Sequence, residues 1–367
     1  MAEPRTIRSP NESVAKKEVL TVQEAQTMIK QIIVEGIYQG IDNTEMAKRI
    51  NAVINEVSAG LKPELAMTVR LALAQSAQNW HFQYMTNLRA VNMSAIEAMM
   101  KTKEVRVANK TYNIDIKSLA GAKPAEQSTI IEKFRPYITE SKHGIALIDD
   151  YEKRVKAQIR VLASNPANTY PTDKNGDTYR MNMRNFAEMK VRYDANQEDV
   201  AKFKNEGVDL VWTSSHADAS GRCAPYQGRL YSISGKTGRT AAGEPYTPLD
   251  EALLGPKGDG NGIINGYNCR HHLIEYTPKS KAPKEYDAAT IRKENVVNGR
   301  QRQYERDIRN LKIEERLERA VGDKSAASDL RNQWQSLNQR YEQYSLQNGR
   351  AFYPWRTRVM QEEVEQD

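Results

Sequence analysis

The sequence predicts an α+β protein that is predominantly helical, with a small loop-rich β-containing module between helical regions. Apolar residues recur at helical spacing early in the chain, Gly, Pro and Asn are concentrated after residue 207, and helical spacing returns after a Lys/Pro/Ser linker. We therefore predict a flexible arm at 1–20, a helical region at 21–207, a module at 208–278 and a helical tail at 279–367.

The first helical region contains a short and a long predicted helix. Apolar residues at i, i+3, i+4 and i+7 predict a helix that Gly60 ends, and nothing interrupts a second helix from Pro63 to about Met100. Between residues 104 and 116 the pattern changes to β-branched and aromatic residues. We therefore predict a short β-hairpin there, with its turn at residues 108–110.

Short strands are predicted in the module, and long helices in the tail. Alternating or β-branched residues indicate strands at 208–212, 229–233 and 270–276. In the tail, apolar residues from Leu330 to Tyr344 follow a heptad-like spacing. The turn-forming pair at 348–349 should end this last helix.

The composition limits the class of protein. Acidic residues (47) are interspersed among the basic ones (54), so the net charge of +7 permits contact with DNA but favours solvated helix faces. No stretch reaches the roughly 20 apolar residues that cross a bilayer, and no secretory signal is visible. We expect folding in a cytoplasm, where Cys223 and Cys269 stay reduced instead of forming a disulfide.

Both cysteines and three of the five histidines lie in the module, which suggests a zinc site. Residues two apart on a strand point to the same side, so Cys269 and His271 could bind one ion together. His216 and Cys223 would complete a tetrahedral set of two thiolates and two imidazoles. The spacing differs from that of a standard zinc finger.

A polar core is the alternative interpretation of the same residues. Small loop-rich modules bury little apolar surface, so buried polar side chains hold their loops together by hydrogen bonds. Asp218 could pair with Arg222 or Arg270, and the cysteines would then be small buried hydrophobic residues.

A catalytic site is the third interpretation. A cysteine beside a histidine could form a thiol nucleophile and its base, and His216, Asn268 and His271 could belong to a metal-dependent nuclease. Neither arrangement has an acidic cluster or a recognised spacing. We therefore predict that the protein is not an enzyme.

The ordered patches of the module resemble a known family. They run from Val211 through Ser215 to His216, then from Tyr226 to Ser232, and from Gly266 to His271. The residues of this motif are Asp218, Arg222, Tyr226, Gln227, Gly228, Asn268 and Arg270. Together with the helical stretch 303–312, they resemble the phage minor capsid protein 2 family, which is related in style to the Mu F-like head morphogenesis proteins. Family members often carry Trp where this chain has Tyr226.

This resemblance implies a structural component of a phage head. Such a protein is made in the bacterial host and present in few copies in the virion, where the portal and major capsid proteins are its expected partners. Phage DNA is a possible partner if the protein is internal or ejected. A metal-dependent enzyme carried in the particle is the remaining alternative. Residues 1–145 resemble no family that we can name.

Overall fold

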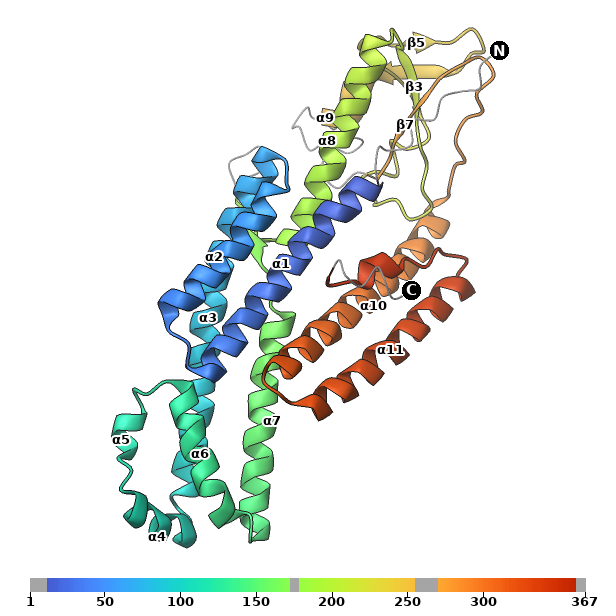
Figure 1. The fold of residues 1–367 in the computed structure, drawn as a ribbon. Helices are drawn as coiled ribbons and strands as arrows, with labels where there is room; N and C mark the ends of the chain where they lie inside the picture. The colour runs from blue at the N-terminus through green and yellow to red at the C-terminus, as the bar shows by residue number, and fades with distance from the viewer. Residues whose placement is uncertain (1–11, 172–177, 255–269, 361–367) are drawn as a thin grey trace. The chain divides into compact units, whose positions relative to one another are not determined.

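The computed structural model describes residues 12–171, 178–254 and 270–360, which are predominantly helical with small sheets, as predicted (Figure 1). The chain forms two compact units, each assembled from separate segments. The first consists of Met1–Val22, Thr169–Glu305 and Tyr341–Arg356. The second consists of Gln23–Asn168, Arg306–Arg340 and Thr357–Asp367.

Six helices lie wholly in the second unit: α2 (Asn43–Ala59), α3 (Pro63–Met99), α4 (Lys103–Tyr112), α5 (Ile116–Leu119), α6 (Pro124–Ile138) and α7 (Lys142–Ser164). Three further helices contribute residues to both units: α1 (Glu12–Gln39), α10 (Ala288–Ala320) and α11 (Lys324–Gln347).

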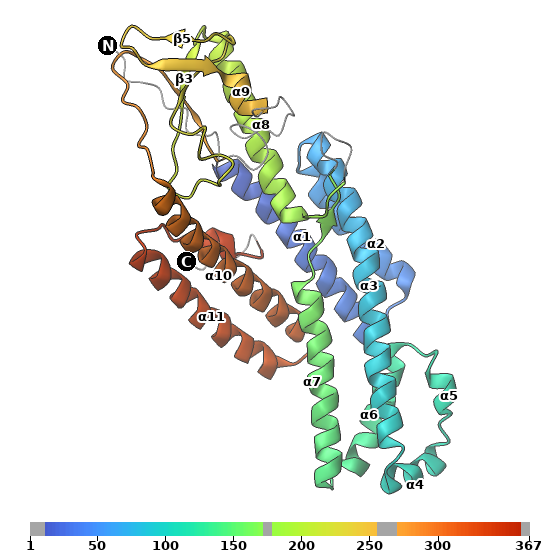
Figure 2. The ribbon, with the colours of Figure 1, turned by 180° about the vertical axis from the view of Figure 1, so that it is seen from behind.

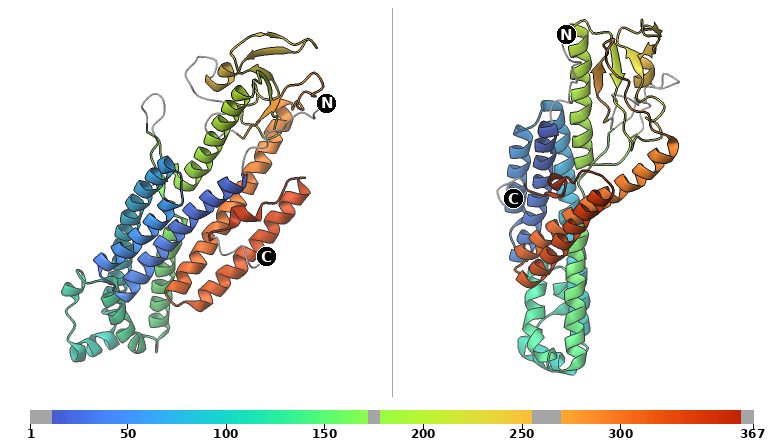
Figure 3. Two further views of the ribbon diagram at one scale, coloured as in Figure 1. Left: turned by 45° about the horizontal axis from the view of Figure 1, so that its top comes forward. Right: turned by 90° about the vertical axis from the view of Figure 1, so that its right-hand side faces the viewer.

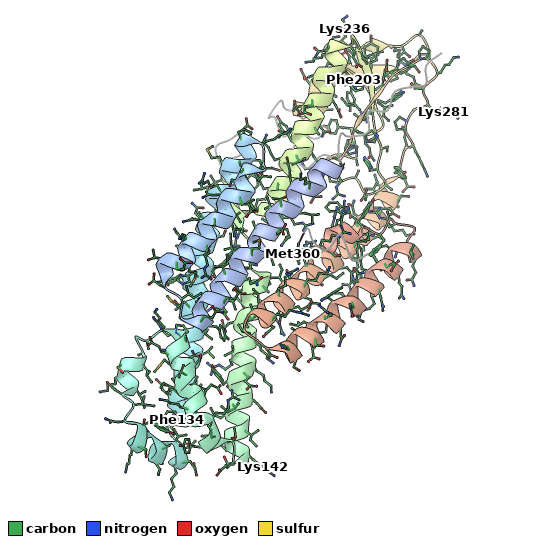
Figure 4. The ribbon with its side chains drawn as sticks, viewed as in Figure 1. Phe134, Lys142, Phe203, Lys236, Lys281 and Met360 are labelled. Atoms are coloured by element: carbon green, nitrogen blue, oxygen red, sulfur yellow. The ribbon has the colours of Figure 1, made fainter. Side chains whose placement is uncertain are left out.

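The long helix α3 organises the second unit. It has Pro63 at its first turn and no interior Gly or Pro, as the sequence predicts. The helices α2, α6 and α7 pack against it, and α7 runs beside it in Figures 1 and 2. A core at its C-terminal half includes Ile96, Val105 and Phe134, all fully buried; Figure 4 labels Phe134.

The predicted β-hairpin at 104–116 is wrong, because residues 103–112 form the helix α4. Thr102 caps its N-terminus by accepting a 3.3 Å hydrogen bond from the backbone N–H of Val105. Val105 and Ala108, three residues apart, are buried, whereas Val107 is 62% exposed. Burial of one helical face therefore overrides the β-propensity of the segment.

The predicted flexible arm at 1–20 is also wrong in part. The helix α1 already begins at Glu12, and Val19 and Leu20 are buried. Burial of these apolar side chains favours an ordered helix over a flexible arm. Residues 1–11 lie outside the described residues.

The first unit combines one long helix with a small mixed sheet (Figure 3). Its elements are β2 (Met181–Asn182), α8 (Met183–Asn205), β3 (Leu210–Thr213), β4 (Leu230–Ser232), β5 (Gly238–Arg239), β6 (Pro245–Pro248), α9 (Leu249–Leu254), β7 (Leu273–Glu275) and the 3₁₀ helix η1 (Pro354–Thr357), whose last residue belongs to the second unit. The two-residue strand β1 (Asn168–Thr169) lies at the boundary of the units. The predicted strands near 210, 230 and 273 are confirmed as β3, β4 and β7.

The five strands are arranged in the order β5-β6-β4-β3-β7. The central strand β3 pairs antiparallel with both β4 and β7, and β4 pairs parallel with β6. Phe203 of α8, labelled in Figure 4, packs with Val211, Tyr231 and Leu273 of the sheet. Gly207, with φ of +74°, lies just after the C-terminal end of α8, at the predicted end of the first helical region.

Within the described residues, none of the helices is both long enough and apolar enough to cross a membrane.

Candidate functional site

Three histidines gather where β3 ends and β7 begins. Because β3 and β7 are antiparallel, with Thr213 opposite Leu273, the residues after β3 lie beside those before β7. The backbone N–H of Ser214 donates a 2.9 Å hydrogen bond to the carbonyl of His272, which extends the ladder. We call Ser214, His216, Gln227, His271 and His272 the histidine cluster.

Two ring contacts and one amide hold the cluster together. The ring of His216 meets that of His271 edge to face, with centroids 4.8 Å apart, and lies 6.3 Å from that of His272. Oε1 of Gln227 accepts hydrogen bonds from the backbone N–H of His216 (2.8 Å) and from Nε2 of His271 (3.1 Å). One carboxamide therefore joins two segments that are 55 residues apart in sequence.

Ser214 links the His216 ring to the backbone before β7. Its Oγ accepts from the backbone N–H of His272 at 3.0 Å and lies 3.0 Å from Nε2 of His216. A hydrogen bond joins this hydroxyl and Nε2, and the tautomer of the ring decides which of the two donates. The same ring hydrogen-bonds to the backbone of Arg270 in a way that raises its pKa, so its second nitrogen is a donor. Both ring nitrogens of His216 are engaged.

The cluster is electrically neutral near pH 7. Burial lowers the pKa of His271 to about 3, and the neighbouring rings of His216 and His272 contribute to the shift. Burial also lowers the pKa values of His216 and His272. The imidazoles therefore act as neutral hydrogen-bonding groups, and protonating them in the fold is unfavourable.

An arginine from the C-terminal part of the chain completes the site. Arg350 donates hydrogen bonds to Asp218 (2.8 Å) and to Glu294 of α10 (3.1 Å), and all three side chains are about four-fifths buried. The sequence suggests Arg222 or Arg270 as the partner of Asp218, whereas its ion-pair partner in the structure is Arg350. This pairing lowers the pKa of Asp218, although burial opposes the shift.

Arg350 was missed because it is distant in sequence and carries no motif. The predicted turn before it is present: α11 ends at Gln347 and Gly349 has a φ of +61°. The backbone N–H of Arg350 bonds to the carbonyl of Ser345, which turns the chain back after the helix. The turn could be predicted from the sequence, but the residues that Arg350 contacts after it could not.

The remaining motif residues act through the backbone or lie at the surface. The carbonyl of Tyr226 accepts from the hydroxyls of Thr213 (3.2 Å) and Tyr231 (2.9 Å). Gly228 has a φ of +67°, which disfavours any side chain there. Arg222 is exposed, whereas Arg270 has solvent-accessible atoms but is surrounded by enough protein that desolvation lowers its pKa to about 10.

The zinc site remains a prediction. Cys269 and Asn268 lie outside the described residues, so their positions relative to His216 and His271 are not given. In the described ranges no group of three metal-binding side chains converges. Cys223 packs against the apolar core of the sheet, and both nitrogens of His216 already have hydrogen-bond partners.

The serine and histidine of the cluster also invite comparison with a nucleophile and its base. Ser214 is only 5% exposed, and its hydroxyl is already used by His272 and His216. A catalytic serine needs an accessible oxygen and a base free to take its proton. The geometry suits a structural link between loops.

Comparison with known proteins agrees with this interpretation. The sequence profile of the family described as Phage minor capsid protein 2 matches residues 132–344, more than half of the chain. These residues include the histidine cluster and most of α10 and α11. The class defined in this way is a structural protein of the bacteriophage particle.

The chain belongs to the phage minor capsid protein 2 family. No curated protein and no solved structure matches it.

Proposed function

We propose that this protein acts in assembly of the phage head, where it contacts the portal or the major capsid protein. The observation that carries the proposal is the cross-linking of distant segments within the first unit. Gln227 joins two loops of the module, and Arg350 joins the module to α10. A module held in this way offers a fixed surface to partners, as an assembly component requires.

The chemistry of the cluster favours assembly over catalysis. The three histidines are neutral, and the serine beside them is buried and hydrogen-bonded. A general base needs a pKa near the working pH and access to substrate. The cluster offers neither property.

The test is quantitative mass spectrometry of purified particles, combined with chemical cross-linking. We expect peptides of this chain at low copy number relative to the major capsid protein, with cross-links to the portal or the shell. Empty heads and DNA-filled heads should contain the same amount. Absence from particles, or cross-links only to host proteins, would overturn the proposal.

A second candidate function, DNA association, is favoured by the distribution of charge on α10. The helix is rich in residues of both signs, but four of its six acidic residues, Glu305, Glu314, Glu315 and Glu318, are at most 6% exposed. The residues of α10 that are exposed and charged are all basic: Arg292, Lys293, Arg300, Arg306 and Arg319. The surface of the helix is therefore more positive than its sequence indicates.

Salt-dependent binding to duplex DNA of arbitrary sequence tests this second function. Binding through these residues should weaken as salt rises, because each phosphate contact releases a counterion. Replacing Arg292, Lys293 and Arg300 by Gln should reduce both affinity and salt dependence. The matched control replaces Lys48, Arg49 and Lys62, which are exposed on other helices or loops. No binding at low salt would remove this candidate.

A further inference from the structure

We infer that a cluster of arginines in the first unit binds a small dianion of the phosphate class, such as inorganic phosphate. The inference goes beyond the proposed function, which requires no small ligand. It rests on three observations: more guanidinium groups than carboxylates, an arginine without an acidic partner, and a buried donor without a hydrogen bond. The arginine cluster consists of Arg184, Arg192, Arg270, Arg302 and Arg356, all in the first unit.

One face of α8 supplies two arginines and one acid of this site. Arg184, Glu188 and Arg192 are spaced by four residues, so their side chains lie on one side of the helix. Arg184 is only 6% exposed, and Glu188 pairs with Arg192. Burial alone would raise the pKa of Glu188, but four guanidinium groups of the cluster lower it to about 2. Most of the cluster therefore surrounds this one carboxylate.

The helix α10 and the 3₁₀ helix η1 each add one arginine, beside a second acid. Glu305 of α10 pairs with Arg302 at 2.9 Å and lies 3.7 Å from Arg356 of η1. The carbonyl of Arg356 accepts a 3.4 Å hydrogen bond from Nη2 of Arg184, which joins η1 to α8. The side chains of Arg302 and Arg356 are largely buried. The site is therefore built from separate elements that converge.

Arg270, which precedes β7, has no acidic partner. Its side chain makes no ion pair and no hydrogen bond with any residue that the structure describes. Burial lowers the pKa of Arg270 to about 10, and three other guanidinium groups of the cluster add to the shift. A cation held among other cations is unfavourable unless an anion joins them. The solvent-accessible atoms of Arg270 give such an anion access to the cluster.

A donor of Arg302 is unused in the same cluster. Nη1 of this side chain donates to Glu305. Nη2 is buried and has no hydrogen-bond partner among the described residues. A buried donor without an acceptor destabilises the fold, and an oxyanion bound at the cluster would supply the missing acceptor.

The charge of the site favours a dianion. The cluster contains five guanidinium groups beside two carboxylates. Asp218 also interacts with Arg270, but it is paired with Arg350, which binds Glu294 as well. Adding these three groups leaves two positive charges in excess among the described residues. Phosphate groups carry about 1.5 to 2 negative charges near pH 7, and guanidinium groups bind their oxygens in bidentate pairs.

Calorimetric titration of the full chain with inorganic phosphate, in a phosphate-free buffer at fixed ionic strength, tests the inference. We expect saturable binding of one phosphate per chain. Phosphate should also raise the melting temperature more than sodium chloride of equal ionic strength does. Arg270→Gln should weaken binding at least about tenfold, because it removes charge-assisted hydrogen bonds. Arg229→Gln, at an exposed arginine of the same unit, is the control and should bind phosphate as the wild type does.

Stability without phosphate separates a ligand site from a purely structural one. If the arginines only held the fold together, Arg270→Gln should melt at a lower temperature than the wild type in phosphate-free buffer. The excess of positive charge predicts an equal or higher melting temperature, because one repelling cation is removed. Glu188→Gln should have the opposite effect. It should melt at a lower temperature without phosphate but bind phosphate more tightly, because a competing carboxylate is gone.

The chain's own carboxylates are the alternative source of oxyanions. Residues 361–367 lie outside the described residues and contain Glu362, Glu363, Glu365 and Asp367. Replacing these four by Gln and Asn should leave the affinity for phosphate unchanged. A tenfold gain in affinity would mean that this segment occupies the site, and would overturn the inference.

Three other results would also contradict a phosphate site. The wild type could fail to bind inorganic phosphate, or bind duplex DNA but not inorganic phosphate. Arg270→Gln could bind phosphate as tightly as the wild type does. Circular dichroism of each variant checks that its helix content is unchanged.

Discussion

Arg350 and Asp218 form a 2.8 Å ion pair although they are 132 positions apart in sequence. Because Arg350 also bonds to Glu294, one guanidinium neutralises two largely buried carboxylates. It thereby ties the histidine-bearing loop to α10 and to the residues after α11. The site therefore depends on a residue from near the end of the chain.

Arg350→Met should lower the free energy of unfolding by about 3 kcal/mol, because it leaves two carboxylates without their cation. Urea denaturation followed by circular dichroism measures the change. The double variant Asp218→Asn with Arg350→Met removes one of these charges and should recover part of the loss. Equal stability of Arg350→Met and the wild type would show that the pair is not important for folding.

Gln227→Ala should lower the free energy of unfolding by about 2–4 kcal/mol. The substitution removes the acceptor of two part-buried donors, the N–H of His216 and Nε2 of His271. Gln343→Ala, at an exposed position of α11 in the same unit, is the control and should change stability by less than about 0.5 kcal/mol. The same urea titration compares them. A loss no larger than that of the control would mean that water replaces the amide.

Lys30 gives a dependence of stability on pH. Its ammonium is fully buried beneath the ring of Trp80 and donates to the carbonyl of Ala163 at 2.9 Å. Burial lowers the pKa of Lys30 from 10.5 to about 7. Between these values the unfolded chain binds more protons than the folded one, so the contribution of Lys30 to stability rises with pH by about 1.4 kcal/mol per unit.

The difference in unfolding free energy between the wild type and Lys30→Met isolates this effect. Between pH 7.5 and 9, the free energy of unfolding of the wild type should rise relative to that of Lys30→Met by about 1.4 kcal/mol per pH unit. Lys48→Met, at an exposed position, is the control. Its difference in unfolding free energy from the wild type should not change with pH. A flat difference for Lys30→Met as well would mean that the amine stays charged or reaches water.

Substitutions of Asn113 test the C-terminal cap of α4. It ends the helix in the left-handed region, with φ of 48° and ψ of 51°. Asn113→Ala should lower stability by about 1 kcal/mol, whereas Asn113→Gly should not lower it, because glycine adopts this conformation without strain. Thermal unfolding distinguishes the two variants, and Lys110→Ala in the same helix serves as the control. Identical melting of the Ala and Gly variants would contradict the left-handed cap.

Elemental analysis tests the predicted zinc site. Because both nitrogens of His216 are hydrogen-bonded, we expect the purified chain to contain no stoichiometric zinc. One zinc ion per chain, lost in both Cys223→Ser and Cys269→Ser, would instead establish the tetrahedral site. In that case Ser214 and Arg270 would have to release the imidazole of His216.

The helices and strands were largely predictable because their signals are local. Pro63 at a first turn and Gly207 with a positive φ mark element ends that the sequence indicates directly. The hairpin prediction failed at Val105 and Val107, where β-branched side chains belong to an amphipathic helix. Tertiary burial decided that segment, and no local pattern reports it.

The candidate site was only partly predictable. The sequence indicates that His216, Gln227 and His271 belong to one motif, and the structure joins them through a single carboxamide oxygen. The role of Arg350 could not be inferred, because an ion pair between distant residues depends on how whole elements pack. The buried acidic side of α10 was missed for the same reason.

The interleaving of the two units has a consequence for synthesis on the ribosome. The first unit contains residues from Met1–Val22 and from Tyr341–Arg356. It therefore cannot be completed until residues 341–356 have been synthesised. Arg350 can reach Asp218 only after the chain has been extended by a further 132 positions. Until then Asp218 and Glu294 lack this guanidinium, so completion of the first unit waits for the segment that carries Arg350.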